Sequence, residues 1–146
     1  MAFILGCALT VLTLLVQTAG ITALIEWLRR VVPGELRYQG MAHAATLVMR
    51  TTIALLVLQG LSILLWAGCY RWFCFSSWAS AFYFSGSTYS TVGYGDVVLP
   101  PQWRTLGPME SILGVLMCGL SVSLLFALIN RLVSQEDGRT AHHGRG

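Results

Sequence analysis

The residues of this chain best suited to bind a ligand stand together at positions 91–96, where the sequence reads TVGYGD. Gly93 and Gly95 reach positive φ at little cost, so the backbone around them can turn successive carbonyl groups to the same side. The β-branched Thr91 and Val92 precede these glycines, and the Thr91 hydroxyl adds one more oxygen at the start of the series. The segment can therefore hold a backbone conformation that a chain of residues with L side chains would resist. Its carbonyl and hydroxyl oxygens are the groups that this conformation would present together.

The rest of the chain has the composition of a membrane protein. Of its 146 residues, 55% are hydrophobic and 10% are charged, far from the average of soluble domains. Four uncharged runs are each long enough to cross about 30 Å of hydrocarbon as a helix. These runs cover residues 2–25, 51–70, 72–95 and 111–130. Little sequence remains for a soluble domain, so we expect the function to lie within the bilayer.

The first run, residues 2–25, is predicted to be a mature transmembrane helix and not a cleaved signal peptide. No basic region precedes it. Its length also exceeds the apolar core of a signal peptide, which has about 7 to 15 residues.

The third run, residues 72–95, differs from the others because it contains six serines, two threonines and three glycines. Hydroxyl groups and glycines in this number suit a segment buried in protein or lining water, since an unsatisfied backbone group in lipid costs several kcal/mol. We therefore expect a re-entrant segment here and three membrane spans in the chain.

The nine arginines support this topology, because short cytoplasmic loops collect positive charge. With three spans, the side of the membrane that holds the C-terminus receives seven of them: Arg29, Arg30, Arg37, Arg50, Arg131, Arg139 and Arg145. The other side receives Arg71 and Arg104. The sequence thus predicts an outside N-terminus, a cytoplasmic C-terminus, and a re-entrant loop that enters from outside.

Residues 91–96 match the selectivity-filter sequence of potassium channels residue for residue, and the chain resembles this family over roughly residues 51–133. The resemblance implies an all-α integral membrane protein with three transmembrane helices, a re-entrant pore helix and a filter loop, assembled as a homotetramer around a central pore. Its parts would be an outer helix at 51–70, a pore helix at about 77–90, the filter at 91–96 and an inner helix at about 108–133.

The resemblance also implies the ligand and its site. Carbonyl groups of Thr91, Val92, Gly93 and Tyr94 would bind K⁺, with Gly95 completing the turn of the backbone. K⁺ would be the permeant ion, and no other cofactor and no nucleic acid is expected. The partners would be the lipid bilayer and three further copies of the chain.

Support for the filter is expected from residues on its two flanks. By the resemblance, Tyr83 and Phe84 occupy two aromatic positions, often Trp, that clamp the filter tyrosine and Asp96, although Phe84 cannot donate a hydrogen bond. Ser87 stands where the family often has a glutamate, so a carboxyl pair with Asp96 is absent. Glu110 has two interpretations: favourable charge at the start of the inner helix, or a hydrogen bond to the back of the filter or the pore helix.

On the inner helix, Gly119 matches the position of the family's gating-hinge glycine, and close helix packing is the alternative reason for a glycine there. Below it, Leu120, Ser123 and Ala127 recur at i, i+3 and i+7. This spacing predicts one helix face that could line a water-filled cavity.

The remaining segments have weaker patterns. Residues 1–28 form the N-terminal helix, of unassigned role, and residues 29–50 are expected to be a cytoplasmic loop with a turn at Pro33 and Gly34 followed by an interfacial helix. Residues 134–146 read as a disordered cytoplasmic tail. Cys69 and Cys74 could form a disulfide in an oxidising compartment. We expect a multi-pass protein of a cell membrane, with the bacterial inner membrane as the first candidate.

Other functions are less well supported by the sequence. Arginines at every third position, nucleotide motifs and calcium loops are all absent, so the gating stimulus is unassigned. No pairing of nucleophile and base predicts an enzyme. Two alternatives stay open. One is a small proton-coupled transporter, which would need a carboxylate deep in the membrane, whereas Glu26 is expected at the membrane edge. The other is a non-conducting regulatory subunit.

Overall fold

The structure, a computed structural model, describes residues 1–35 and 41–143. Its elements are the helices α1 (Ala2–Glu35), α2 (Met41–Phe73), α3 (Trp78–Tyr89) and α4 (Leu106–His143) and a short 3-10 helix η1 (Pro101–Trp103). No strand occurs in the described ranges, and α1, α2 and α4 are each long and apolar enough to cross a membrane. The expected all-α class with three candidate spans is confirmed.

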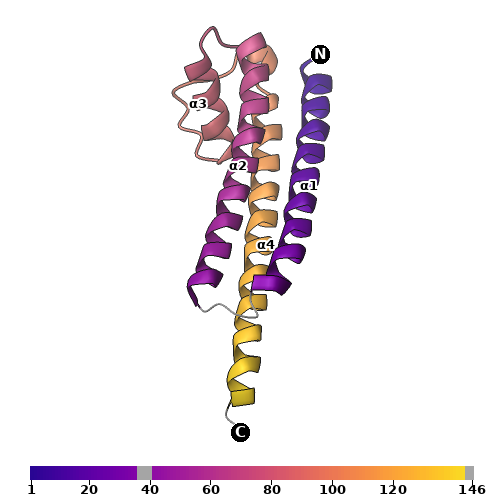
Figure 1. Ribbon diagram of the computed structural model, residues 1–146. Helices are drawn as coiled ribbons and strands as arrows, with labels where there is room; N and C mark the ends of the chain where they lie inside the picture. Colours follow the sequence, from indigo (N-terminus) through magenta and orange to yellow (C-terminus); the bar gives the residue numbers. More distant parts are fainter. Residues whose placement is uncertain (36–40, 144–146) are drawn as a thin grey trace.

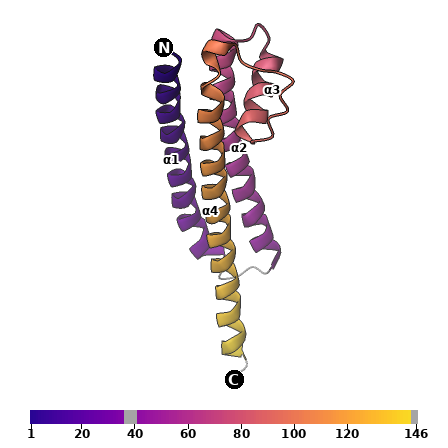
Figure 2. The same ribbon diagram turned by 180° about the vertical axis from the view of Figure 1, so that it is seen from behind.

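The three long helices run side by side, and the short helix α3 lies near one end of this bundle (Figure 1). Seen from either side, α3 is next to α2 and α4 and on the opposite side of the bundle from α1 (Figure 2). The chain therefore leaves the end of α2, turns back through α3, and returns to the same end before α4 begins.

Two apolar clusters hold the bundle together. One joins α1, α2 and α4 and consists of Leu24, Leu28, Leu47, Leu55, Leu128 and Leu132. The other joins α2, α3 and α4 and consists of Trp66, Tyr70, Ala81, Leu99, Leu106 and Leu113. Lipid tails are as apolar as leucine, so close packing and buried hydrogen bonds must specify this arrangement in a membrane.

Serine caps define the two ends of α3. The side chain of Ser77 accepts a hydrogen bond from the Ala79 N–H at 3.2 Å, which is the usual role of an N-cap residue. At the other end, the Ser90 N–H donates to the Gly86 carbonyl at 3.1 Å. α3 thus ends at Tyr89, and its C-cap Ser90 directly precedes residue 91.

The helices at the other end of the bundle differ from the sequence-based expectation for residues 29–50. α1 continues through Pro33 and Gly34, where a turn was expected, because a proline in the last turn removes a single helical hydrogen bond. α2 begins at Met41, so the segment expected to be an interfacial helix is the start of the second long helix. Residues 36–40 lie outside the described residues.

The C-terminal helix is also longer than expected. Its backbone continues from the expected end near residue 133 to His143, through most of the segment 134–146 that was expected to be disordered. Each residue added to an existing helix forms one more hydrogen bond, so extension is easier than initiation. Residues 144–146 lie outside the described residues.

The closest approach between α3 and α4 depends on a glycine. A Cβ atom on Gly114 would lie 1.9 Å from the carbonyl oxygen of Tyr89, so the two helices would have to separate. We expect Gly114→Ala to lower the free energy of unfolding by about 1–3 kcal/mol, the usual cost of overpacking. Denaturant unfolding of the purified protein in detergent measures this.

Gly119→Ala is the matched control, because nothing lies within 4 Å of a Cβ at Gly119. Its stability should be unchanged or higher, since alanine favours helix more than glycine does. Equal destabilisation by the two alanines would contradict the steric account of Gly114.

Candidate functional site

The segment that follows α3 has an alternating backbone. The φ angles are positive at every second residue: 63° at Thr91, 53° at Gly93 and 78° at Gly95. When left-handed and right-handed residues alternate, successive N–H groups face one side of the chain and the carbonyl oxygens face the other. This geometry suits a row of carbonyl ligands for a cation.

Thr91 is strained, because a β-branched residue in the left-handed region costs about 1–3 kcal/mol. Two backbone hydrogen bonds to the last turn of α3 offset that strain. The Thr91 N–H donates to the Thr88 carbonyl and the Gly93 N–H donates to the Ser87 carbonyl, each at 3.0 Å. From the sequence, positive φ was expected at Gly93 and Gly95 and was not expected at Thr91. The signal for Thr91 was that it precedes Gly93 by two residues, as Gly93 precedes Gly95.

Tyr83 connects α3 to the far end of the segment. Its hydroxyl donates to Asp96 Oδ2 at 2.9 Å, and its ring stacks on Tyr94 with centroids 6.3 Å apart and planes 13° apart. The other carboxylate oxygen of Asp96 accepts from the Val97 N–H at 3.0 Å. The structure therefore brings Tyr83, Tyr94 and Asp96 together.

Phe84 and Ser87 have different surroundings. The Phe84 ring packs edge-on against Tyr70 at 5.0 Å, within the apolar cluster of α2, α3 and α4. The Ser87 hydroxyl donates to the Phe84 carbonyl at 3.0 Å, so the contribution of Ser87 to residues 91–96 comes from its backbone carbonyl.

Glu110 is fully buried where α2, α3 and α4 meet. Its Oε2 accepts from the Tyr70 hydroxyl at 2.7 Å, and its Oε1 accepts from the Ser85 hydroxyl. The sequence analysis considered a hydrogen bond from Glu110 to the filter or to the helix before it. In the structure, the bond with Ser85 joins Glu110 to α3, the helix that precedes the segment 91–96. Tyr70 and Ser85 were missed, since they lie 40 and 25 residues from Glu110 in sequence and no local pattern marks them.

All six residues of the segment 91–96 are exposed in the single chain, Tyr94 by 71% and Val92 by 52%. On α4, Gly119, Leu120 and Ser123 are exposed as well. α4 is continuously helical through Gly119, whose carbonyl accepts from the Ser123 hydroxyl at 2.9 Å. One chain thus leaves the candidate site open on one side.

Ala127, the last of the expected cavity residues, is also exposed, and on α4 it lies one helical turn beyond Ser123. It borders a cavity of about 260 Å³ between α1 and α4, together with Arg29 and Arg131. The expected cavity face of α4 therefore reaches the edge of the contact with α1.

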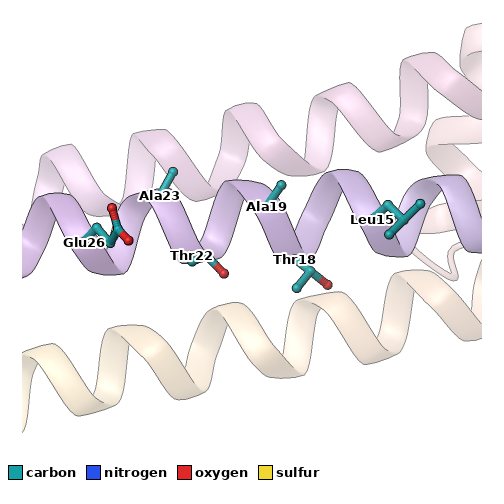
Figure 3. A pocket seen from close by; sticks show the side chains of 6 residues that line it. All are labelled: Leu15, Thr18, Ala19, Thr22, Ala23 and Glu26. Carbon is teal, nitrogen blue, oxygen red and sulfur yellow. The ribbon is translucent and has the colours of Figure 1, made fainter.

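A second hollow, of about 470 Å³, follows the open side of α1. Figure 3 shows the side chains that line it: Leu15, Thr18, Ala19, Thr22, Ala23 and Glu26. Glu26 stands at one end, is 63% exposed, and forms an ion pair with Arg30 at 3.6 Å. An exposed pair of this kind contributes little to stability.

The cysteines and the other possible metal ligands are dispersed. Cys69 and Cys74 are both free thiols, and burial raises the pKa of the Cys74 thiol, which favours its neutral form. Over the part of the chain that the structure describes, His, Cys, Asp and Glu side chains form no cluster of three that could hold a metal ion.

Comparison with known protein families matches residues 46–131 to the model described as ion channel. This is more than half of the chain and includes most of α2, all of α3, the segment 91–96 and α4 as far as Arg131. α1 lies outside it. Neither the curated proteins nor the solved structures contain a match.

The buried contact of Glu110 should matter more for stability than the exposed contact of Asp96. Tyr70→Phe leaves one oxygen of a buried carboxyl group without its donor, so we expect the free energy of unfolding to fall by about 1–3 kcal/mol. Tyr83→Phe makes the same chemical change at an exposed hydroxyl and should cost less than about 0.5 kcal/mol in the isolated chain. Unfolding in detergent compares the two, and equal losses would refute the importance of burial.

Proposed function

The chain belongs to the ion channel family, and on that premise we propose that it is a potassium-selective channel through which K⁺ passes down its gradient across the membrane. The observation that carries the proposal is the positive φ at residues 91, 93 and 95 within the sequence TVGYG. The carbonyl groups of Thr91, Val92, Gly93 and Tyr94, with the Thr91 hydroxyl, would replace the water shell of the ion, as the TVGYG loops of potassium channels do.

Two features support a re-entrant position for α3. The helix has 12 residues and is therefore about 18 Å long, too short to cross about 30 Å of hydrocarbon. The whole connection from α2 to α4, which contains α3, also leaves and returns at the same end of the bundle (Figure 1). α3 would then be the pore helix, and its C-terminal end would direct partial negative charge at the ion's path.

Four copies are needed to surround an ion, because one chain supplies one loop. The exposure of residues 91–96 in the single chain fits this requirement. In the proposed homotetramer, the four segments face a common axis and the exposed residues of α4, including Leu120 and Ser123, face the water-filled cavity below them.

The orientation follows from the arginines. Arg71 belongs to the last turn of α2 and Arg104 comes just before α4, so both stand where α3 is attached to the bundle. Among the other described arginines, Arg29 and Arg30 belong to the second half of α1, Arg50 to the first half of α2 and Arg131 to the second half of α4. These halves form the other end of the bundle (Figure 1). Positive charge accumulates on the cytoplasmic side of membrane proteins. We therefore propose that the filter opens outward, that the C-terminus is cytoplasmic, and that the protein resides in a cell membrane.

The transporter alternative needs a proton-binding carboxylate in contact with a substrate path. Glu26 is exposed and paired with Arg30, and Glu110 is enclosed between two hydroxyl donors. These surroundings favour the channel. Passive conduction involves no catalysis, so no enzymatic activity is proposed.

The first test is ion flux into liposomes that contain the purified protein. We expect K⁺ to enter and Na⁺ to be excluded, because the carbonyl sites would replace the water shell of K⁺ at little net cost. Equal permeation of K⁺ and Na⁺ would contradict the proposed selectivity. A protein that conducts neither ion would instead favour a regulatory subunit.

The second test is Gly93→Ala, which should abolish K⁺ flux, because an L side chain is strained at a φ of 53°. Gly60→Ala is the control, because Gly60 lies in α2 and nothing lies within 4 Å of a Cβ atom there. The K⁺ flux of this variant should equal that of the wild type. Flux that survives in Gly93→Ala would show that this backbone geometry is not required.

The third test is the mass of the assembly in detergent by native mass spectrometry. We expect the mass of four chains of 16.0 kDa for the wild type and for Gly93→Ala, because the substitution changes the filter backbone and leaves the helices intact. A monomer or dimer as the largest species would contradict the proposed tetramer.

A further inference from the structure

α1 lies outside the family match, yet it carries a polar side chain that is almost fully buried. Gln17 is 2% exposed, and a buried amide in an apolar helix is costly unless it is hydrogen-bonded. Its Nε2 has three acceptors on α2: Ser62 Oγ at 2.8 Å, Gln59 Oε1 at 3.2 Å and the Leu58 carbonyl at 3.2 Å. Gln17 therefore joins α1 to α2 through a cluster of hydrogen bonds.

Gln59 extends this connection to the other two helices. Its Oε1 also accepts from the Tyr89 hydroxyl of α3 at 2.7 Å, and its Nε2 donates to Ser121 Oγ of α4 at 3.2 Å. The orientation of this amide is thereby fixed, because two donors meet its oxygen. The Gln59 side chain therefore links α2 to α1, α3 and α4.

Tyr89 is the point at which this network meets the candidate site. It is 2% exposed, is the last residue of α3, and precedes the strained Thr91 by two positions. On its other side, the Tyr89 carbonyl is in close contact with Gly114 of α4. The turn from α3 into the segment 91–96 is thus fixed between α2 and α4, with Tyr89 as its anchor.

We propose that Gln17 is a positioning residue for the filter: it fixes the Gln59 amide, which holds Tyr89 and so determines where the segment 91–96 begins. The N-terminal helix then sets ion selectivity without contacting the ion. This inference rests on the proposed potassium-channel function. It assigns a role to the one long helix that the family match leaves out.

The test is the ratio of K⁺ to Na⁺ permeability, measured from reversal potentials in planar bilayers. Gln17→Met keeps the length of the side chain and removes its donor, so we expect the ratio to fall by about threefold to tenfold, the equivalent of one hydrogen bond. Thr13→Val is the matched control. Thr13 is also buried on α1 and accepts from Trp66 Nε1 at 3.1 Å, but it has no contact with Gln59. Its ratio should equal that of the wild type.

A second variant tests the same connection from its other end and does not depend on the folding of Gln17→Met. Tyr89→Phe keeps the ring, loses the hydroxyl that meets Gln59, and should lower the permeability ratio in the same direction. In the double variant, the loss should be no larger than that of the more severe single variant, because both break one pathway.

The outcomes separate the inference from the function on which it rests. A wild type that selects K⁺, with Gln17→Met or Tyr89→Phe at the wild-type ratio, would overturn the positioning role and leave the channel proposal intact. An equal loss in Thr13→Val would also overturn it, since general weakening of α1 packing would then explain the effect. A wild type without K⁺ selectivity would overturn both.

Discussion

The buried carboxyl group of Glu110 is the contact on which the rest of the site depends. It accepts hydrogen bonds from Tyr70 of α2 and Ser85 of α3 while it belongs to α4 itself, so three helices must meet at one point. A short helix such as α3 is marginal in isolation. Its position therefore comes from these partners, and the segment 91–96 takes its position from α3.

The connection through Gln59 complements that of Glu110. Ser85 and Tyr89 are four residues apart, so they lie on the same face of α3, one helical turn apart. Glu110 holds the first of these residues and Gln59 holds the second. Two fixed points on one face prevent α3 from rotating about its axis, and the backbone strain at Thr91 can then be retained.

Much of this architecture could be predicted from local patterns. Hydrophobic composition predicted the three candidate membrane spans. The many hydroxyl groups of residues 72–95 distinguished the segment that contains α3 from those spans, and the spacing of Gly93 and Gly95 indicated the candidate site. What the sequence could not supply were contacts between distant positions, such as Gln17 with Ser62 or Tyr70 with Glu110, because each polar residue has many possible partners until the helices are packed. The expected turn at Pro33 was missed for a related reason: the cost of a proline depends on its place in the helix.

The openness of residues 91–96 has a genetic consequence. These exposed side chains contribute little to helix packing within one chain, where their contacts are those of Tyr94 and Asp96 with the exposed Tyr83. A copy with a defective sequence in this segment would therefore still fold and would still join the proposed tetramer. If defective and intact copies were made in equal amounts and mixed at random, about one tetramer in sixteen would contain four intact filters. Lesions in this segment should therefore be dominant, whereas lesions that unfold the chain should be recessive.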